Sequence, residues 1–264
     1  MRRVWAGTRQ LVRDILSATA PRGGRDVLMQ FSLMYGLYYL YRITRALAQG
    51  REAVAFANAD AVVRAERALG IYWEPWLQAR FSSVEPVMSG MIWFYREAHL
   101  PVMVACLAWV FMRHRDIWPL FRNWFLSLNL IGLIFYTVMP TAPPRMLSTS
   151  GVVDMAYLYR DDVAFASAPS IFANPYAAMP SLHFAYALFV AVCVYALARP
   201  LWLRRAASMY PLMCFLAIVV TGNHFILDAV GGALAVLVAW LVAWRLPVGD
   251  VVREPARLIR DDEL

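Results

Sequence analysis

The sequence contains no lysine, and all 25 of its basic residues are arginines. Cysteine is almost as scarce, with three in 264 residues, at Cys106, Cys193 and Cys214. Each cysteine lies inside an apolar run, and their positions form neither a disulfide framework nor a zinc-ligand spacing. We therefore expect three small buried side chains and exclude disulfide-rich and zinc-finger proteins.

The chain also lacks the features of a signal peptide and of a nucleic-acid-binding module. Residues 1–26 are basic, but Arg9 and Arg13 interrupt the apolar core that a signal peptide needs. The formal net charge is +7, yet the arginines are spread along the chain between apolar runs. Because no basic helix and no aromatic platform for bases occurs outside those runs, we expect no nucleic-acid partner.

Apolar sequence is abundant: 61% of the residues are hydrophobic and the mean hydropathy is +0.51. A soluble domain rarely reaches such values. Six apolar runs come close to the roughly 20 residues that a helix needs to cross a bilayer. We therefore predict an all-α fold, a polytopic integral membrane protein built as a six-transmembrane-helix bundle. The predicted spans lie near residues 27–48, 87–112, 118–139, 182–198, 206–222 and 225–246.

The distribution of arginine among the loops predicts an orientation in the cell membrane. The segment 1–26, the loop at 113–115, the turn at 199–205 and the tail 247–264 are all basic, and they are alternate loops. Basic loops stay in the cytoplasm, so both termini are predicted to be cytoplasmic and the other loops extracytoplasmic. The single catalytic membrane domain is predicted to be 27–246, between the cytoplasmic N-terminal segment and the tail.

Two of the predicted extracytoplasmic loops are long. Residues 49–86 mix apolar and charged residues, among them Glu66 and Glu74, as in a helix that lies on a membrane surface. Such a helix could be a lid or lipid-entry ramp, or a brace over the bundle. Residues 140–181 contain several prolines that exclude a long helix, and a long loop between two polar motifs often builds a site.

Three polar motifs stand at the ends of apolar runs. In the segment 221–228, His224 and Asp228 share one face if a helix starts near Asn223. In the segment 179–183, Pro180-Ser181 is typical of a helix start with Ser181 as the N-cap. His183 would then lie in a first turn whose free N–H groups suit an anion. The third motif, 140–145, ends in a fixed cation, Arg145, and together the motifs indicate phosphate chemistry at a membrane surface.

These motifs resemble the three signature motifs of the type-2 phosphatidic acid phosphatase superfamily. They are most similar to the branch that contains fungal inositol phosphorylceramide synthases and related bacterial proteins. The resemblance covers about residues 27–246, with Pro-Ser-Leu-His in place of Pro-Ser-Gly-His. The superfamily's usual lysine and second arginine would fall at Val138 and Ile218. Two cations are missing at those positions, which favours the synthase-like branch over a simple phosphatase.

The resemblance implies a catalytic role for three residues. His224 would attack phosphorus and form a phosphohistidine, and Asp228 would fix its tautomer. His183 would protonate the leaving oxygen and then deprotonate the incoming water or alcohol. Such a scheme needs no metal and no cofactor. The alternative use of two histidines and a carboxylate is a metal-binding facial triad, but a neighbouring arginine and helix N-termini favour an anion.

Four further residues are predicted to bind the substrate. Arg145 would grip the phosphoryl oxygens, Ser181 would complete the oxyanion cradle, and Asn223 could replace part of a missing arginine. His99 shares a helix face with Tyr95 deep in the second span, where polar groups are expensive unless they face protein or water. We predict that His99 lines the outer cavity and holds a head group. The alternative is a network of charges that only braces helices.

The substrate is predicted to be a membrane phospholipid or a polyprenyl phosphate. Transfer of a phosphoryl or phosphorylated head group to an alcohol makes the protein a lipid phosphotransferase, and transfer to water makes it a lipid phosphate phosphatase. A transporter or a scaffold without catalytic activity is a further alternative, because intramembrane histidine, aspartate and arginine also serve proton relays. The oligomeric state stays open.

Overall fold

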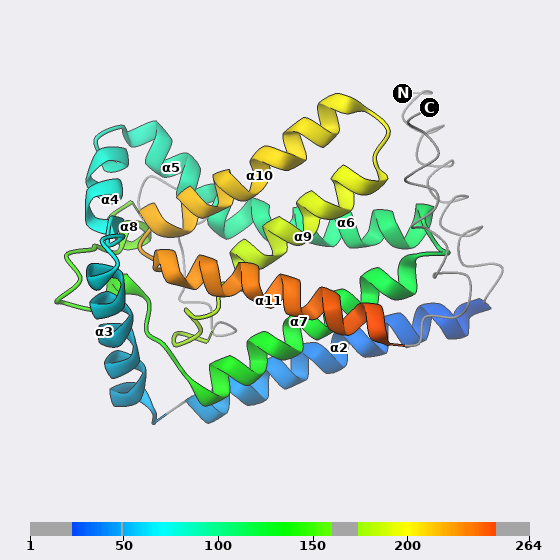
Figure 1. The fold of residues 1–264 in the computed structure, drawn as a ribbon, viewed down its shortest axis with the longest axis horizontal. Coiled ribbons are helices and arrows are strands. Elements are labelled where there is room, and N and C mark those ends of the chain that lie inside the picture. The colour runs from blue at the N-terminus through cyan, green and yellow to red at the C-terminus, as the bar shows by residue number, and fades with distance from the viewer. Residues whose placement is uncertain (1–22, 49, 160–173, 247–264) are drawn as a thin grey trace.

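The structure, a computed structural model, describes residues 23–48, 50–159 and 174–246. This part of the chain is helical, with one isolated parallel bridge between Thr141 and Ala177, so the predicted all-α fold is confirmed. Long helices run along the long axis of the molecule (Figure 1). They are α2 (Gly23–Ala48), α5 (Glu85–Trp93) continued by α6 (His99–Arg113), α7 (Trp118–Val138), α9 (Leu182–Leu197), α10 (Leu201–Val220) and α11 (Ile226–Arg245).

Each predicted span therefore contains a long helix, although one boundary was wrong. The fifth was expected to begin at 206, but α10 begins at Leu201 and includes Arg204 and Arg205. Pro200 is its N-cap, and its carbonyl accepts from the N–H groups of Leu203 and Arg204. The arginines were expected to belong to the loop before this span, but arginine is a good helix former and these two lie in the first turns of α10.

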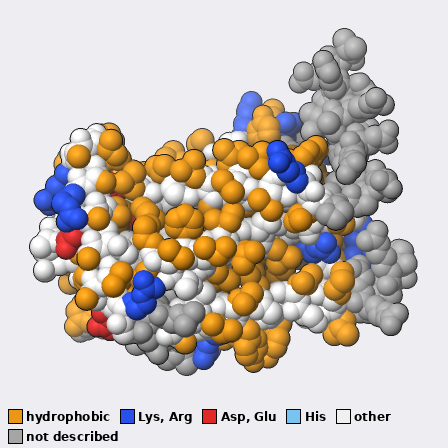
Figure 2. Space-filling model, turned by 60° about the horizontal axis from the view of Figure 1, so that its bottom comes forward, with side chains coloured by type: hydrophobic (Ala, Val, Ile, Leu, Met, Phe, Trp, Pro, Cys, Tyr) orange, Lys and Arg blue, Asp and Glu red, His pale blue; other side chains and the backbone are white. Residues whose placement is uncertain are grey.

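Apolar side chains cover the long helices on the face in Figure 2, and charged side chains gather toward the two ends. Within the described residues, α10 and α11 are long and apolar enough to cross a membrane, and α9 is apolar but shorter. These features are compatible with membrane association. Six crossings of the membrane remain a prediction.

The second long helix contains an irregular turn close to the polar motifs. Between α5 and α6 the backbone forms a π-helical turn, η1 (Phe94–Ala98). Pro101 follows, and it has no N–H for the carbonyl of Glu97 four residues earlier. Such π turns often occur at functional sites, and this one carries Tyr95 and leads directly into His99.

Helix α9 lies at the centre of the bundle, where it packs against α6, α7, α10 and α11. It buries Ala185, Phe189 and Cys193, and all three cysteines are buried as predicted. Its N-terminus lies close to α11 at Gly232, which has no side chain. A Cβ atom at this position would lie only 2.5 Å from the carbonyl oxygen of Ser181. The starts of α9 and α11, which carry two of the polar motifs, are therefore held side by side.

The predicted surface segment 49–86 is helical, as α3 (Glu52–Ala68) and α4 (Glu74–Ser82). In Figure 1 these helices and the short α8 (Met155–Leu158) stand at one end of the bundle, and α2 begins and α11 ends at the other. The Asn58 amide donates to the carbonyl of Pro140 at 2.8 Å, and the Ala142 N–H donates to that of Ala55 at 3.1 Å. These contacts favour the brace over the lid.

The sequence pattern was wrong about two glutamates in this segment. Glu66 and Glu74 were expected on the polar face of a surface helix, but neither side chain is exposed. Each carboxylate instead accepts a hydrogen bond from a backbone N–H at the start of α11. A buried cap and a solvated charge look the same in a sequence, because both place a carboxylate among apolar residues of a helix.

Candidate active site

His224 lies in the tight connection between α10 and α11, and not inside a helix. The last span was predicted to begin near 225, and α11 begins at Ile226 with Phe225 as its N-cap. The N–H groups of Asn223 and His224 both bond to the carbonyl of Ile218, each at 3.1 Å, so they complete the end of α10. Gly222 makes this possible with a φ of +78°, which a glycine adopts without strain.

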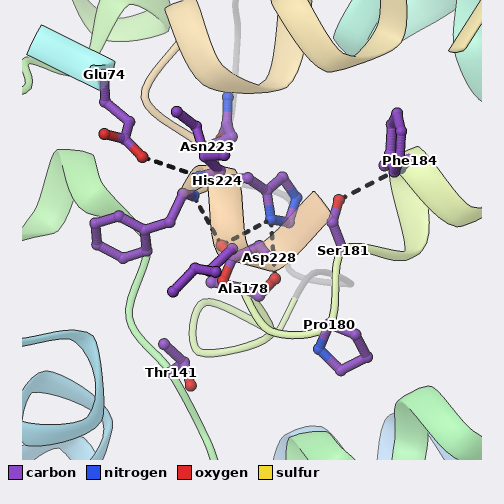
Figure 3. A network of polar contacts seen from close by, with 12 residues as sticks. Glu74, Thr141, Ala178, Pro180, Ser181, Phe184, Asn223, His224 and Asp228 are labelled. Atoms are coloured by element: carbon purple, nitrogen blue, oxygen red, sulfur yellow. Dashed lines mark hydrogen bonds and ion pairs between the residues drawn. The ribbon is translucent and has the colours of Figure 1, made fainter. Parts of the chain in front are cut away.

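The imidazole of His224 is held from one side by two oxygens (Figure 3). Its Nδ1 lies 2.9 Å from the carbonyl oxygen of Ala178 and 3.3 Å from Oδ2 of Asp228. Both oxygens are acceptors, so Nδ1 carries the proton and Nε2 keeps its lone pair. The ring is 4% exposed and lines a cavity. A histidine in this tautomer can attack an electrophile through Nε2.

Ser181 begins α9 and connects it to α11. Its hydroxyl accepts from the N–H of Phe184 at 3.3 Å, which confirms the predicted N-cap. Its own N–H donates to the backbone carbonyl of Asp228 at 2.9 Å. His183 follows in the first turn of α9, and its ring centroid lies 5.8 Å from that of His224. The two histidines are therefore close enough to act on opposite sides of one small group.

Aromatic rings surround His183 on its other side. The ring of Tyr95 stacks on it with centroids 4.5 Å apart, and the His99 centroid lies 5.4 Å away. His99 lines the cavity as predicted, but it is only 1% exposed and its Nδ1 contacts the Tyr210 hydroxyl at 2.8 Å. Its Nε2 has no hydrogen-bond partner in the described part of the chain. These contacts place His99 beside His183.

Arg145 is attached to the turn that precedes His224. Its N–H donates to the carbonyl of Gly222 at 3.0 Å, and its guanidinium donates to the side-chain oxygen of Asn223. Its Nε also pairs with Asp154 at 3.2 Å. The side-chain oxygen of Asn223, the residue that could replace part of a missing arginine, therefore accepts from the arginine that is present.

The two positions of the missing cations lack any polar group. Val138 is 70% exposed at the end of α7, and Ile218 is fully buried in α10. Another arginine, Arg96 in η1, lines the same cavity as Arg145. The sequence offers Arg96 among several arginines that could restore the lost charge, and the packing of the helices brings it to the cavity.

The cavity has a volume of about 670 Å³ and two kinds of lining. His183, His224, Arg145 and Asn223 form a polar end. The other walls are largely apolar and come from α2, α6 and α7, including Met34, Leu37, Leu100, Met103, Val104, Phe125 and Leu133. A volume of this size is typical of small-molecule sites, and its lining suits an anionic group attached to an apolar chain.

Several residues that fix the site were absent from the sequence prediction. The Tyr136 hydroxyl donates to the carbonyl of Pro180 at 3.0 Å, and the amide of Gln78 donates to the carbonyls of Val153 and Val220 at 2.9 and 3.0 Å. Ala178 acts through its backbone oxygen, which leaves no signal in the sequence. In the described residues, no group of three or more histidine, cysteine or acidic residues could hold a metal ion.

The chain matches a known protein family. The model of the PAP2 superfamily matches residues 60–242, a range that contains all three polar motifs and most of the long helices. No curated protein and no solved structure matches the chain. The matched range begins in the middle of α3 and ends near the end of α11, so α2 lies outside it.

Proposed function

The chain belongs to the PAP2 superfamily, whose members are phosphatases or phosphotransferases, and from this premise we propose that it transfers a phosphorylated head group of a membrane lipid through a phosphohistidine on His224. One observation carries the proposal. Two imidazoles with centroids 5.8 Å apart, one with its Nδ1 proton fixed by two oxygens, share a cavity with Arg145.

The reaction has two steps. Nε2 of His224 forms a P–N bond while the bond from phosphorus to the leaving oxygen breaks, and His183 gives its proton to that oxygen. An alcohol then attacks phosphorus, the P–N bond breaks, and the alcohol proton passes to His183. Asp228 and the carbonyl of Ala178 hold the Nδ1 proton and stabilise the positive charge that develops on His224.

The charge of the cradle favours a phosphodiester as donor. Arg145 is already paired with Asp154, so part of its charge is neutralised before any substrate binds. A phosphodiester carries one negative charge. A terminal phosphate carries about 1.5 to 2 negative charges at neutral pH, because its second pKa is about 6. The apolar walls of α2, α6 and α7 would hold the lipid chains. These features agree with the inositolphosphotransferase-like branch that the motifs resemble.

The second candidate function is hydrolysis of a lipid phosphate such as phosphatidate or a polyprenyl phosphate. Arg96 favours it, because a second guanidinium in the same cavity would balance a doubly charged phosphate. Arg96→Ala separates the two candidates. If a monoester is the substrate, the KM for phosphatidate should rise by about 10-fold or more, whereas turnover of a diester donor should change little.

We place the reaction on the extracytoplasmic side of the cell membrane, with both termini in the cytoplasm. The support is the distribution of arginine among the loops. In Figure 1 the site motifs lie at the end of the bundle that α3 and α4 cover, and α2 begins and α11 ends at the opposite end.

The test uses the purified protein in detergent micelles with a panel of labelled phospholipid donors and alcohol acceptors. Transferase activity requires the label to appear in an acceptor, and His224→Ala should abolish it. Label trapped on wild-type protein after acid-free quenching, and absent from His224→Ala, would identify the phosphohistidine. The transferase proposal is refuted if free phosphate from a monoester lipid is the sole product and no acceptor competes with water. The protein would then be a lipid phosphate phosphatase.

A further inference from the structure

Three consecutive backbone N–H groups at the start of α11 each bond to a different carboxyl group. Phe225 donates to Asp228 at 2.9 Å, Ile226 to Glu74 at 2.9 Å and Leu227 to Glu66 at 2.7 Å. Asp228 belongs to the site. The two glutamates come from α4 and α3, 152 and 161 residues earlier in the chain. Figure 3 shows Glu74 reaching the start of α11 beside His224 and Asp228.

The two glutamates accept from adjacent backbone N–H groups, so their carboxyl groups are neighbours in the protein interior. Neither is exposed, and the second oxygen of each, Oε2, finds no donor among the described residues. Burial, followed by the neighbouring carboxyl group of Glu74, raises the pKa of Glu66 to about 9. Two ionised carboxylates in contact would repel each other strongly in a buried place. One proton between the two free oxygens removes that repulsion and satisfies both.

The neighbours of the pair reinforce its need for a proton. Glu66 faces Glu74 from α4 and Asp228 from α11, and both raise its pKa. Between α3 and α4 lies Tyr72, whose pKa burial raises to about 12, so its phenol stays neutral. The guanidinium of Arg67 lies 5.0 Å from the centroid of the Tyr72 ring. The third carboxylate beside the pair, that of Asp228, therefore adds to the repulsion that a shared proton relieves.

We propose that Glu66 and Glu74 are positioning residues, a proton-sharing pair that holds the first turn of α11 and thereby fixes His224 and Asp228 for the reaction. Neither glutamate lines the cavity, so neither touches the substrate. Their effect passes through the backbone of Ile226 and Leu227 to the carboxylate that orients His224. A displacement of about 1 Å at a reacting group can cost about 100-fold in rate.

Glutamine substitutions distinguish a shared proton from simple packing. In Glu66→Gln the amide oxygen still accepts from Leu227 and the amide N–H donates to Glu74, so the substitution reproduces the protonated state. Glu74→Gln does the same from the other side. In the double variant Glu66→Gln/Glu74→Gln, two amide nitrogens face each other and neither can accept. Each single variant should therefore be tolerated and the double variant should not, a non-additive outcome that side-chain volume does not produce.

The experiment measures amide hydrogen exchange across residues 224–228 and steady-state transfer from a labelled phospholipid donor to an alcohol acceptor, using the full chain in detergent. In Glu66→Ala and in the double glutamine variant, exchange at these residues should be at least about 10-fold faster and kcat about 10- to 100-fold lower, with KM little changed. Each single glutamine variant should stay within about threefold of wild type. Activity of Glu66→Gln should also persist above pH 9, where the wild type loses the shared proton.

The exposed glutamate Glu85 at the start of α5 provides the control, and Glu85→Ala should match wild type in every measurement. Unchanged exchange in α9 verifies that each variant is folded. The pair has no positioning role if Glu66→Ala leaves exchange and kcat unchanged, or if each single glutamine variant is as damaged as the double. The kinetic arm rests on the proposed function, but exchange does not. If exchange is fast in Glu66→Ala but the wild type shows no turnover, the proposed function is refuted while the positioning role of the two glutamates stands.

Discussion

At the scale of residues, His224 is oriented by more than its acidic partner. The carbonyl of Ala178 lies closer to Nδ1 than Asp228 does, at 2.9 Å against 3.3 Å. Asp228 also bonds to the N–H of Phe225, so one carboxylate caps α11 and supports the histidine. The tautomer of His224 therefore has two independent supports, and the loss of either should cost less than the loss of a sole partner.

The substitution Asp228→Asn tests this redundancy. The amide oxygen can still accept from Phe225, so the fold should persist. Where an aspartate alone holds a histidine tautomer, its change to asparagine costs about 10⁴-fold. Because the Ala178 carbonyl still favours a protonated Nδ1, we expect about a 100-fold loss of kcat, whereas His224→Ala should abolish turnover. Asp60→Asn, at a surface contact with Thr149, is the matched control. A loss as large as that of His224→Ala would contradict the role of the carbonyl.

At the scale of elements, the sequence predicted helices better than it predicted their ends and their contacts. The apolar runs located every long helix, because burial in a bundle and in a membrane both need apolar stretches of about 20 residues. The start of α10 was wrong, since Arg204 and Arg205 are compatible with a helix. Burial of Glu66 and Glu74 depends on contacts between distant segments, which one sequence does not encode locally.

The close approach of α9 and α11 makes a prediction about Gly232. In Gly232→Ala the new Cβ would lie 2.5 Å from the backbone oxygen of Ser181, so α11 has to move away from α9. We expect about 1–3 kcal/mol of lost stability together with a large loss of kcat, because His183 and His224 separate. Thermal unfolding in detergent and the activity assay measure these effects. Gly36→Ala on α2, where a Cβ meets nothing within 4 Å, should change neither. A fully active, stable Gly232→Ala would mean that the helices are farther apart.

The carboxyl pair makes a prediction about stability and pH. The folded pKa of Glu66 is about 9, above its unfolded value of 4.5, so the folded state binds more protons than the unfolded state between these values. Stability should therefore fall as the pH rises from about 5 to about 9. Glu66→Gln cannot lose a proton, so its thermal unfolding should depend less on pH over this window. Equal pH dependence in wild type and Glu66→Gln would show that Glu66 ionises normally in the folded state.

At the scale of the whole molecule, polar and apolar regions are separated along one axis. The long helices form an apolar middle, α3 and α4 cover the end with the site, and the α6–α7 connection lies at the other end (Figures 1 and 2). His224 in the cavity lining directly precedes the start of α11, which Glu66 of α3 and Glu74 of α4 contact. The apolar lining residues come from α2, α6 and α7. A lipid lying parallel to the helices would thus have its phosphate at Arg145 and its chains among apolar residues.

This arrangement predicts which ends of the molecule are accessible from outside the cell. Ser148, in the loop after Arg145, is exposed at the site end, and Asp116, between α6 and α7, is exposed at the other end. Ser148→Cys in intact cells should react with a membrane-impermeant maleimide, whereas Asp116→Cys should react only after permeabilisation. Cys106, Cys193 and Cys214 are buried, so the unmodified protein provides a low background. Both substitutions replace exposed side chains, so the fold should tolerate them. Labelling of Asp116→Cys in intact cells, with Ser148→Cys protected, would reverse the orientation that the arginines predict and place the reaction on the cytoplasmic side.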